Sequence, residues 1–369
     1  MRIIVLCKRQ YTGKDLLDDR YGRLYEIPRH LALNNHQVVG LCLSYRNRQE
    51  GHIQGVAIDK SPVEWHSINL GLSVLPGLFR HRQYLSRLIA EFNPQLILAC
   101  SDVFHVIAGV NMARRLNIPC VADLYDNFES FGATRIPGIT HLFRNSVNKA
   151  TGVLCVSDTL NEYVRETCNP QGAVKTVVNG INTELFHPMD KQSCRQHLGL
   201  SVDTRIIGTA GAISRSRGIE TLFEGFAQLS KDDPGLHLAL SGPICPDVTL
   251  PSGPSIHYLG NLPQTEVPLL LNALDVAIIC NIDTPFGRHC FPQKTYEILA
   301  CKVPVVAARV GAMAKLLCHH SECLYSPADI SSFTEAVRDQ LQTPSKINIP
   351  VPTWSELTKE VEELLEGCL

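Results

Sequence analysis

The chain has 369 residues, with 34 Lys and Arg against 36 Asp and Glu, so its formal net charge is −2. Hydrophobic residues make up 44% and charged residues 19%, which is ordinary globular usage and excludes a disordered or collagen-like chain. This length corresponds to about two domains. Because proteins that bind nucleic acid usually carry a basic excess, we expect no nucleic-acid partner.

The 14 cysteines are dispersed from Cys7 to Cys368, a distribution typical of reduced, buried thiols. The nearest approach to a metal motif, Cys318-His319-His320-x-x-Cys323, lacks a second half at zinc-finger spacing, so we expect no metal. No signal-peptide pattern opens the chain, and no apolar run reaches the roughly 18 residues of a membrane span. The sequence predicts a cytoplasmic protein, with peripheral contact to the inner face of the membrane left open.

Short apolar runs alternate with helical patterns along nearly the whole chain. Many of the runs are continuous, which is typical of parallel strands covered by helices on both faces. The sequence therefore predicts an α/β fold with parallel sheets and right-handed crossovers. The predicted strands are residues 3–6, 38–43, 96–99, 120–123, 152–156, 174–178, 205–209, 237–241, 255–259, 276–280, 303–308 and 322–325. The predicted helices are residues 23–34, 80–92, 106–116, 159–167, 218–229, 266–274, 293–301, 331–341 and 354–366.

The strands form one group before residue 180 and another after residue 204, which predicts two Rossmann-like units in tandem. Asn179-Gly180 is a turn signal and Pro188 closes the segment that follows, so we expect a linker near residues 185–200. Ligands of two such doubly wound sheets bind at the carboxyl ends of the strands, in a cleft between the sheets. The predicted domains are residues 1–188, residues 189–345 and a C-terminal helix within residues 346–369.

Several common α/β enzyme motifs are missing from the sequence. The loop after the first strand has no G-x-G-x-x-G, which argues against a dinucleotide-binding enzyme. Gly13-Lys14 is followed by Asp15 and has no upstream glycine at the spacing of a phosphate-binding Walker loop. A G-x-S-x-G elbow, which would indicate a hydrolase, is also absent.

The first candidate ligand site lies within residues 285–311, PFGRHCFPQKTYEILACKVPVVAARVG. A turn around Pro292 leads into a helix, and the first turn of a helix offers unpaired N–H groups and a positive dipole end to a diphosphate. Lys294 adds a charge there. Glu297, one turn further on, can accept two hydroxyl hydrogen bonds, as from a ribose.

The second candidate site lies within residues 208–220, GTAGAISRSRGIE. A strand runs into a turn at Gly211, followed by Arg215, Arg217 and a helix from Gly218. Backbone donors and guanidinium groups in such a loop converge on anions. Each segment alone could be an ordinary strand–loop–helix with solvated charges, but the two together favour a shared anion site.

These segments belong to a set that keeps one order over nearly the whole chain. Each piece alone is weak, and the combination is specific. The set is Val156-Ser157, Val178-Asn179-Gly180-Ile181-Asn182, Phe186-x-Pro188, Gly211 with Arg217-Gly218, Tyr258-Leu259-Gly260-Asn261, Phe291-Pro292-Gln293-Lys294-Thr295-Tyr296-Glu297 and Pro304-Val305-Val306-Ala307. In this set the chain resembles the family-4 glycosyltransferases (glycosyl transferases group 1), most closely in its C-terminal half.

The resemblance implies the GT-B fold, two Rossmann-like domains facing each other across a cleft, with the C-terminal helix packed back on the N-terminal domain. It implies transfer of a sugar from a nucleotide-diphosphate donor with retention of configuration, without a metal or other cofactor. Glu297 matches the donor-ribose glutamate of an E-x7-E motif, and Arg217 matches the phosphate-binding lysine of the glycine loop at Gly211. Lys294 belongs to a P-x-K-x-x-E variant that starts at Pro292.

Three positions depart from the family pattern. His289 stands where the first glutamate of E-x7-E lies near the donor sugar, and we keep it as a candidate donor contact. Ala212 replaces the usual arginine after the loop glycine, a charge that Arg215 could supply. Tyr125 takes the place of a histidine in the acceptor-side loop of the N-terminal domain.

The candidate catalytic residues are Asp126 and His105 on the acceptor side, with Arg217 and Lys294 stabilising the leaving diphosphate. Asp126 follows a predicted strand and could anchor or deprotonate an acceptor. His105 follows another, although a lone histidine is more often structural. In residues 70–92 an apolar group of Leu75, Leu78 and Phe79 adjoins Arg80, Arg82 and Arg87. This segment could touch an anionic membrane carrying a lipid-linked acceptor or could be an ordinary surface helix.

Two same-fold alternatives have less support. An epimerase would need acid and base groups around a sugar nucleotide, and a phosphorylase would need a phosphate site; the sequence specifies neither. A further alternative is a non-catalytic relative or partner subunit that only binds a nucleotide sugar. His289, Ala212 and Tyr125 favour it, whereas the donor-site set with Arg217 argues against it. UDP is the commonest carrier in the family. The sequence does not identify the nucleotide base or the sugar of the donor. It also does not identify the acceptor, which could be a carbohydrate, a lipid-linked molecule or a small molecule.

Overall fold

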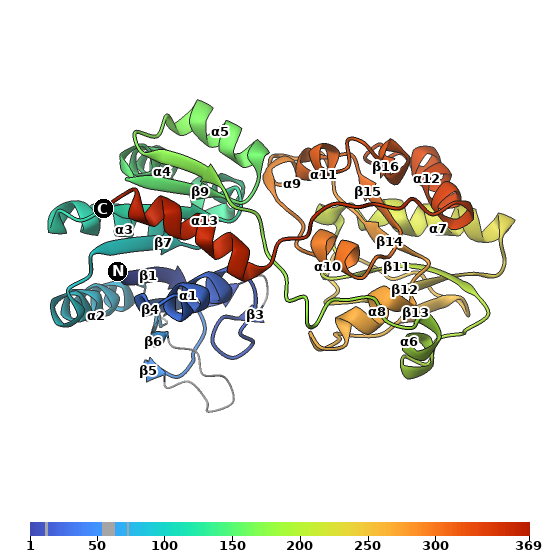
Figure 1. The fold of residues 1–369 in the computed structure, drawn as a ribbon, viewed down its shortest axis with the longest axis horizontal. Coiled ribbons are helices and arrows are strands. Elements are labelled where there is room, and N and C mark those ends of the chain that lie inside the picture. The colour runs from blue at the N-terminus through green and yellow to red at the C-terminus, as the bar shows by residue number, and fades with distance from the viewer. Residues whose placement is uncertain (12–13, 54–62, 72–73) are drawn as a thin grey trace. The chain divides into compact units, whose positions relative to one another are not determined.

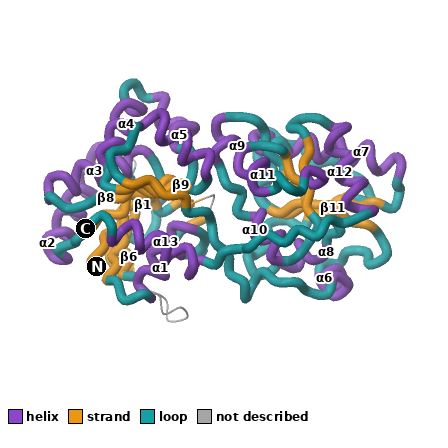
Figure 2. Tube along the Cα trace, turned by 45° about the horizontal axis from the view of Figure 1, so that its top comes forward, coloured by secondary structure: helices purple, strands orange, loops and turns teal. Residues whose placement is uncertain are grey.

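The computed structural model describes residues 1–11, 14–53, 63–71 and 74–369. These residues form two compact units. Unit 1 comprises Met1–Asn179 with Trp354–Leu369, and unit 2 comprises Gly180–Thr353. Each has strands at its centre and helices outside (Figure 2).

Unit 1 is built on an eight-stranded sheet, counted over the described residues, in the order β10-β9-β8-β7-β1-β4-β6-β5. All of its pairings are parallel except that of β5 with β6. The strands are β1 Arg2–Lys8, β4 Gln37–Ser44, β5 Gly51–Ile53, β6 Glu64–Asn69, β7 Leu96–Cys100, β8 Cys120–Leu124, β9 Gly152–Cys155 and β10 Ala173–Thr176, with a separate hairpin of β2 Gln10–Tyr11 and β3 Lys14–Asp15. The helices are α1 Arg23–Leu33, α2 Val74–Phe92, α3 Val103–Leu116, α4 Ile139–Lys149, α5 Asp158–Cys168 and α13 Trp354–Glu366.

The last helix, α13, returns to unit 1 and lies beside α1 (Figure 1). Its apolar residues are buried, with Val361 and Leu365 fully so. On the polar side, Glu362 pairs with His36 at 2.6 Å and accepts a hydrogen bond from the Asn34 amide. Unit 1 is therefore assembled from both ends of the chain.

Unit 2 has a six-stranded parallel sheet in the order β13-β12-β11-β14-β15-β16. Helices α7 and α12 pack over one face, where a Cβ atom at Gly225 would lie 2.2 Å from the Phe333 ring. The strands are β11 Arg205–Ala210, β12 Leu236–Ser241, β13 Ile256–Tyr258, β14 Val276–Ile279, β15 Val305–Ala308 and β16 Leu324–Tyr325. The helices are α6 Lys191–His197, α7 Ile219–Asp232, α8 Val267–Ala273, α9 Pro285–His289, α10 Lys294–Ala300, α11 Gly311–Leu316 and α12 Ile330–Gln342.

The predicted α/β class with two parallel sheets is confirmed, and one buried strand was missed. Strand β6 has a polar sequence, yet all of its residues except Glu64 are buried. Two of its polar side chains have partners inside the fold: the His66 ring bonds the Tyr84 hydroxyl at 2.8 Å, and Ser67 accepts from Arg9 at 3.2 Å. A hydropathy pattern does not reveal a strand whose polar side chains find buried partners.

The predicted linker at residues 185–200 is wrong, because this segment contains α6, packed against α8. The buried Arg195 guanidinium donates to the carbonyl of Ala273 and pairs with Asp275 at 2.7 Å. The division between units falls at Asn179/Gly180 rather than at residue 188. Ile181 bonds the carbonyl of Pro352, which holds the start of the segment in unit 2.

Candidate functional site

Two glycine turns follow the adjacent strands β11 and β12 in unit 2. Gly211 has a φ of 117° and Gly242 a φ of 130°, both in the region that favours glycine. The N–H of Gly211 donates to the carbonyl of Ser241 at 2.8 Å. A Cβ atom at Gly242 would lie 2.0 Å from the carbonyl oxygen of Gly211, so the two backbones pack directly on each other.

Lys294, at the start of α10, reaches this glycine turn. Its Nζ lies 3.4 Å from the hydroxyl of Thr209 and would be 3.5 Å from a Cβ atom on Gly211. Burial lowers the pKa of Lys294, and the Arg217 charge lowers it further, although Cys280 and Glu297 act in the opposite direction. A half-buried ammonium group beside a second cation is a place where an anion would bind.

Arg217 is oriented by short helix α9. Its guanidinium carbon lies 4.3 Å from the centre of the Phe286 ring, a cation–π arrangement, and Nη1 lies 3.7 Å from the Cys290 sulfur. Helix α9 starts at a cap in which Thr284 accepts a hydrogen bond from the N–H of Gly287. The arginine is thus held against a structured surface rather than extended into solvent.

The structure brings together Gly211, Arg217, Lys294 and Glu297. Glu297 is only 7% exposed, and the turn before α10 is closed by a hydrogen bond from Thr295 to the carbonyl of Pro292. Helix α10 has only seven residues, so the side-chain cations contribute more to this site than the helix dipole.

Two predicted donor residues lie at the edge of this group. Arg215 pairs with Glu220 at 3.1 Å and its side chain is 59% exposed. The idea that Arg215 replaces the charge missing at Ala212 is therefore not supported by its position. His289 ends α9 and is half-buried.

In unit 1, His105 and Asp102 form a pair at the start of α3. Asp102 caps the helix: its Oδ1 accepts from the N–H groups of Phe104 and His105, each at 3.0 Å, and bonds the His105 ring nitrogen Nδ1 at 2.8 Å. Burial opposes ionisation of Asp102, but His105 and Lys8 outweigh it and hold the pKa of the carboxyl below its ordinary value. His105 itself is 4% exposed, and its ring nitrogen Nε2 is buried without a hydrogen-bond partner.

The loop after β8 carries Tyr125 and Asp126. Tyr125 is buried, and its hydroxyl donates to the carbonyl of Ser101 at 3.0 Å. Its ring stands edge-on to Tyr11, with ring centres 5.0 Å apart. Tyr125 therefore packs in the unit, whereas the next residue, Asp126, is half-buried.

Comparison with known proteins places this geometry in a family. Residues 23–185 match the model of Glycosyltransferase Family 4, and residues 204–343 match that of Glycosyl transferases group 1. The chain belongs to the group 1 glycosyltransferases. The matched residues include Arg217, Lys294 and Glu297 in unit 2 and Asp126 in unit 1.

Curated relatives of this glycosyltransferase are distant. The putative teichuronic acid biosynthesis glycosyltransferase TuaC of Bacillus subtilis is 26% identical over 62% of this chain and 57% of its own length. D-inositol 3-phosphate glycosyltransferase 2 of Catenulispora acidiphila is 26% identical over 51% of this chain and 47% of its own. The chain thus spans about half the length of the curated relatives it matches.

Solved structures share the fold over the whole chain. Sucrose-phosphate synthase from Thermosynechococcus elongatus has a TM-score of 0.76 at 18% identity, covering 100% of this chain and 95% of its own. HepE of Anabaena in complex with UDP-glucose has a TM-score of 0.72 at 16% identity, covering 100% and 98%. The GT-B fold expected from the sequence is therefore confirmed.

Sequence reasoning missed three contacts of this glycosyltransferase site. Phe286 had no signal of its own, because only the fold brings its ring to Arg217. Thr209 is an interior strand residue until Lys294 is placed beside it. Asp102 did carry a signal, since an aspartate just after a strand and before a helix is a typical cap.

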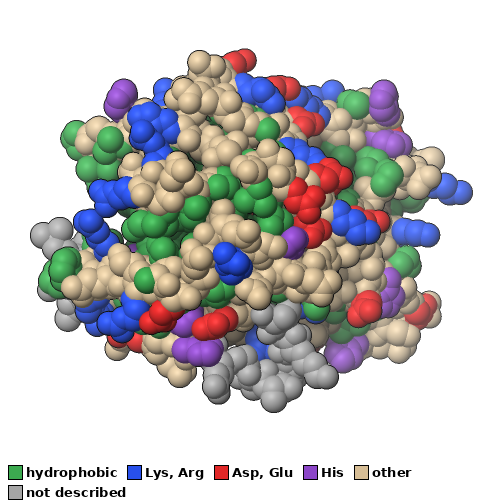
Figure 3. Space-filling view, turned by 60° about the vertical axis from the view of Figure 1, so that its left-hand side comes forward, with side chains coloured by type: hydrophobic (Ala, Val, Ile, Leu, Met, Phe, Trp, Pro, Cys, Tyr) green, Lys and Arg blue, Asp and Glu red, His purple; other side chains and the backbone are tan. Residues whose placement is uncertain are grey.

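Helix α2 carries the surface that we considered for membrane contact. Phe79 is 61% and Leu78 43% exposed, while Arg80 pairs with Glu50 at 3.0 Å. The side chain of Leu75 lies outside the described residues. Hydrophobic and basic side chains are mixed on one face of the molecule (Figure 3). Within the described ranges, no helix is long and apolar enough to cross a bilayer.

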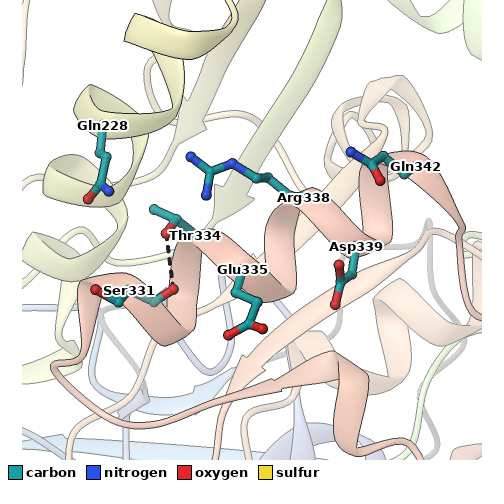
Figure 4. A pocket seen from close by; sticks show the side chains of 7 residues that line it. All are labelled: Gln228, Ser331, Thr334, Glu335, Arg338, Asp339 and Gln342. Atoms are coloured by element: carbon teal, nitrogen blue, oxygen red, sulfur yellow. Dashed lines mark hydrogen bonds between the residues drawn. The ribbon is translucent and has the colours of Figure 1, made fainter.

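A pocket of about 480 Å³ lies between α7 and α12. Its lining is polar and includes Arg338, which pairs with Asp232 (Figure 4). None of the donor-site residues lines this pocket. In the part of the chain that the structure describes, no three His, Cys, Asp or Glu side chains are grouped as metal ligands.

Proposed function

We propose that this protein transfers a sugar from a nucleotide-diphosphate sugar to a hydroxyl group of an acceptor. The observation that carries the proposal is the convergence of Arg217 and Lys294 beside the turn at Gly211. Two cations that repel each other in the free protein are stabilised when a diphosphate lies between them. Glu297, buried one turn into α10, supports binding of the donor ribose.

In the proposed reaction, an acceptor oxygen forms a bond to the anomeric carbon while the bond from that carbon to the diphosphate breaks. The electron pair of the broken bond remains on the diphosphate. Arg217 and Lys294 stabilise this growing negative charge, an electrostatic effect that is often the largest single catalytic term. Because these cations can neutralise the leaving group, we propose that no metal is required.

We propose that configuration at the anomeric carbon is retained by attack on the same face from which the diphosphate departs. The sequence offers no confident nucleophile for a covalent intermediate. In same-face attack, the proton of the acceptor hydroxyl passes to the departing diphosphate oxygen or to Asp126. Closure over the donor would exclude water, which otherwise competes as acceptor.

UDP-sugars, hexosyl donors among them, are the donors we propose first. The solved relatives include HepE with UDP-glucose and a trehalose-6-phosphate enzyme of E. coli with UDP-2-fluoro glucose. A role in polysaccharide assembly is supported by the relative TuaC, a putative teichuronic acid biosynthesis glycosyltransferase. We further propose that the protein acts in the cytoplasm or at the inner face of the membrane. A lipid-linked acceptor would bring the exposed Phe79 of α2 to the membrane.

The test is release of nucleotide diphosphate from a panel of UDP-, GDP- and dTDP-sugars in the presence of EDTA. Arg217→Ala and Glu297→Gln are compared with Arg338→Ala, a matched control on the surface of α12. We expect release from one donor, at least about 100-fold slower for Arg217→Ala, the size of effect seen when one transition-state donor is removed. Glu297→Gln should mainly weaken donor binding.

Four outcomes would contradict parts of the proposal. Release that requires an added metal would refute the metal-independent reaction, and an inverted product would refute retention. Thermal stabilisation by a donor without release, even with cell lipid extract added, would indicate a non-catalytic nucleotide-sugar-binding protein. Equal loss in Arg338→Ala would show that the effects are not specific to the site.

A further inference from the structure

The contact between Phe286 and Arg217 joins two segments that are distant in the sequence. Arg217 ends the 3-10 turn Arg215–Arg217 after β11, and Phe286 lies in α9, which follows β14. Strands β11 and β14 are adjacent and parallel, so the segments after them start at the same edge of the sheet. The guanidinium carbon lies 4.3 Å from the ring centre, well within the roughly 6 Å of a cation–π contact.

Close backbone packing sets the distance between these two segments. Gly218, directly after Arg217, has a φ of 72°, and a Cβ atom there would lie 2.7 Å from the side chain of Ile282. A Cβ atom at Gly287, directly after Phe286, would lie 2.0 Å from the carbonyl oxygen of Ile282. The turn that carries the guanidinium group and the helix that carries the ring therefore pack on the same residue.

Helix α9 has five residues, too few to be stable by itself, and neighbouring side chains hold it. The hydroxyl of Thr284 accepts a hydrogen bond from the N–H of Gly287 at 3.1 Å. The buried Asn281 amide donates to the carbonyl of Gly287 at 3.0 Å. These bonds fix both backbone groups of the residue next to Phe286, so the half-buried ring is presented in a defined position.

A planar guanidinium group is suited to such a ring. It can lie on the ring face and still direct N–H groups, in its own plane, toward the oxygens of an anion. A long side chain that is free in solution loses rotamer freedom when it binds a ligand, and this loss weakens binding. A ring that holds the guanidinium group in advance reduces that loss.

We propose that Phe286 is a positioning residue of the donor site: its ring holds the Arg217 guanidinium group in the orientation that binds the diphosphate. The inference rests on the proposed sugar transfer and adds to it a residue that acts through Arg217. It also requires a guanidinium group at this position, because an ammonium group carries the same charge but has no planar face to lie on the ring.

The contact itself is tested in the ligand-free full chain, by NMR of the arginine side-chain Nε–Hε groups. We expect the Arg217 Hε signal, assigned by its loss in Arg217→Lys, to be shifted upfield by the ring current of Phe286. Phe286→Leu should remove this shift, and Phe286→Tyr, which keeps a ring, should preserve it. An unshifted Arg217 signal in the unmodified protein would overturn the inference.

The effect on binding is tested by calorimetry with UDP. We expect Phe286→Leu to weaken UDP binding by about 3–10-fold, the range of one partly exposed cation–π contact, and Phe286→Tyr to stay within about twofold. In the Arg217→Ala background, Phe286→Leu should change the affinity by less than about twofold, because no guanidinium group remains to be positioned. Phe223→Leu, a half-buried ring of α7 packed on the core of unit 2, is the matched control.

Arg217→Lys provides a second comparison that leaves α9 unaltered, should Phe286→Leu fail to fold, and we expect it to weaken UDP binding several-fold. Full affinity in Arg217→Lys would overturn the inference. So would equal weakening by Phe286→Leu with and without the Arg217 side chain, since that is the result of a purely structural role. A failure of the proposed function gives a different result: the unmodified protein then binds none of UDP, GDP and dTDP although its Arg217 signal is shifted, and the inference fails with it.

Discussion

At the level of single residues, the proposed donor site holds two cations whose mutual repulsion lowers the stability of the ligand-free protein. Lys294 is half-buried beside Arg217, and the nearby Cys280 and Glu297 do not offset burial and that repulsion, since the pKa of Lys294 is lowered overall. A lysine with a lowered pKa binds its proton less well in the folded than in the unfolded state. Its charge therefore destabilises the ligand-free protein at neutral pH, and a bound diphosphate removes that penalty.

We predict that Lys294→Met raises the melting temperature of the ligand-free protein while weakening UDP binding by about 10–100-fold, the value of a charged hydrogen bond. In the unmodified protein, UDP affinity should fall with rising pH below the ordinary lysine pKa of 10.5, because the ammonium group loses its proton early. Calorimetry and thermal unfolding measure both effects. Lys231→Met, on the exposed side of α7, is the control; a lower melting temperature for Lys294→Met alone would refute the prediction.

At the scale of elements, the site depends on turns that let backbones approach closely. Gly211 and Gly242 follow neighbouring strands, and both have a φ that disfavours a side chain. At Gly242 there is also no room for one. Helix α9 is held in a similar way, since a Cβ atom at Gly311 would lie 2.1 Å from the carbonyl oxygen of Arg288. These contacts fix the segments that carry Arg217 and Lys294, so that the two charges lie near each other.

We predict that Gly242→Ala destabilises unit 2 by more than about 2 kcal/mol, because it adds a backbone collision to the cost of positive φ. Gly211→Ala has a similar φ (117° against 130°) but would meet only the end of Lys294, at 3.5 Å, so it should cost less, about 1 kcal/mol. Urea denaturation of the two variants separates collision from conformational cost. Equal losses in both would mean that the close approach at Gly242 is unimportant.

At the scale of the whole molecule, the chain leaves unit 1, builds unit 2 and returns. The extended segment before α13 is anchored by the bond from Ile181 to Pro352, and α13 then packs on α1. The exit of the chain from unit 1 is fixed too: the fully buried Arg23 pairs with Asp123 at 2.8 Å and donates to the carbonyls of Val177 and Val178.

We predict that Leu365→Ala destabilises unit 1 by about 2–5 kcal/mol, as buried leucine truncations do. Hydrogen exchange should then increase in α1 and β9, which α13 contacts, and stay unchanged in the β11–β15 sheet. Glu366→Ala, one residue on and exposed, should change neither. Increased exchange throughout unit 2 would show that the two units do not unfold separately.

Local sequence patterns are sufficient to predict the fold class, the parallel sheets and the candidate donor residues. Continuous apolar runs mark buried parallel strands, and a glycine turn followed by arginines marks an anion-binding loop. The same local reading fails where a residue's environment comes from distant parts of the chain. Strand β6 is polar in sequence, but two of its polar side chains have buried partners. The sequence also predicts a linker where the structure has α6.

Which of these candidate residues lie near one another depends on the tertiary structure. Arg215 and Arg217 are almost adjacent in the sequence but have different partners. Arg215 pairs with Glu220, whereas Arg217 lies against the ring of Phe286. The tertiary structure also gathers Lys8, Tyr45, Asp102 and Asp126 at one sheet edge, where sequence reasoning had found only Asp126 and His105. The physical reason is strand order: residues far apart in the chain become neighbours when parallel strands end at the same edge.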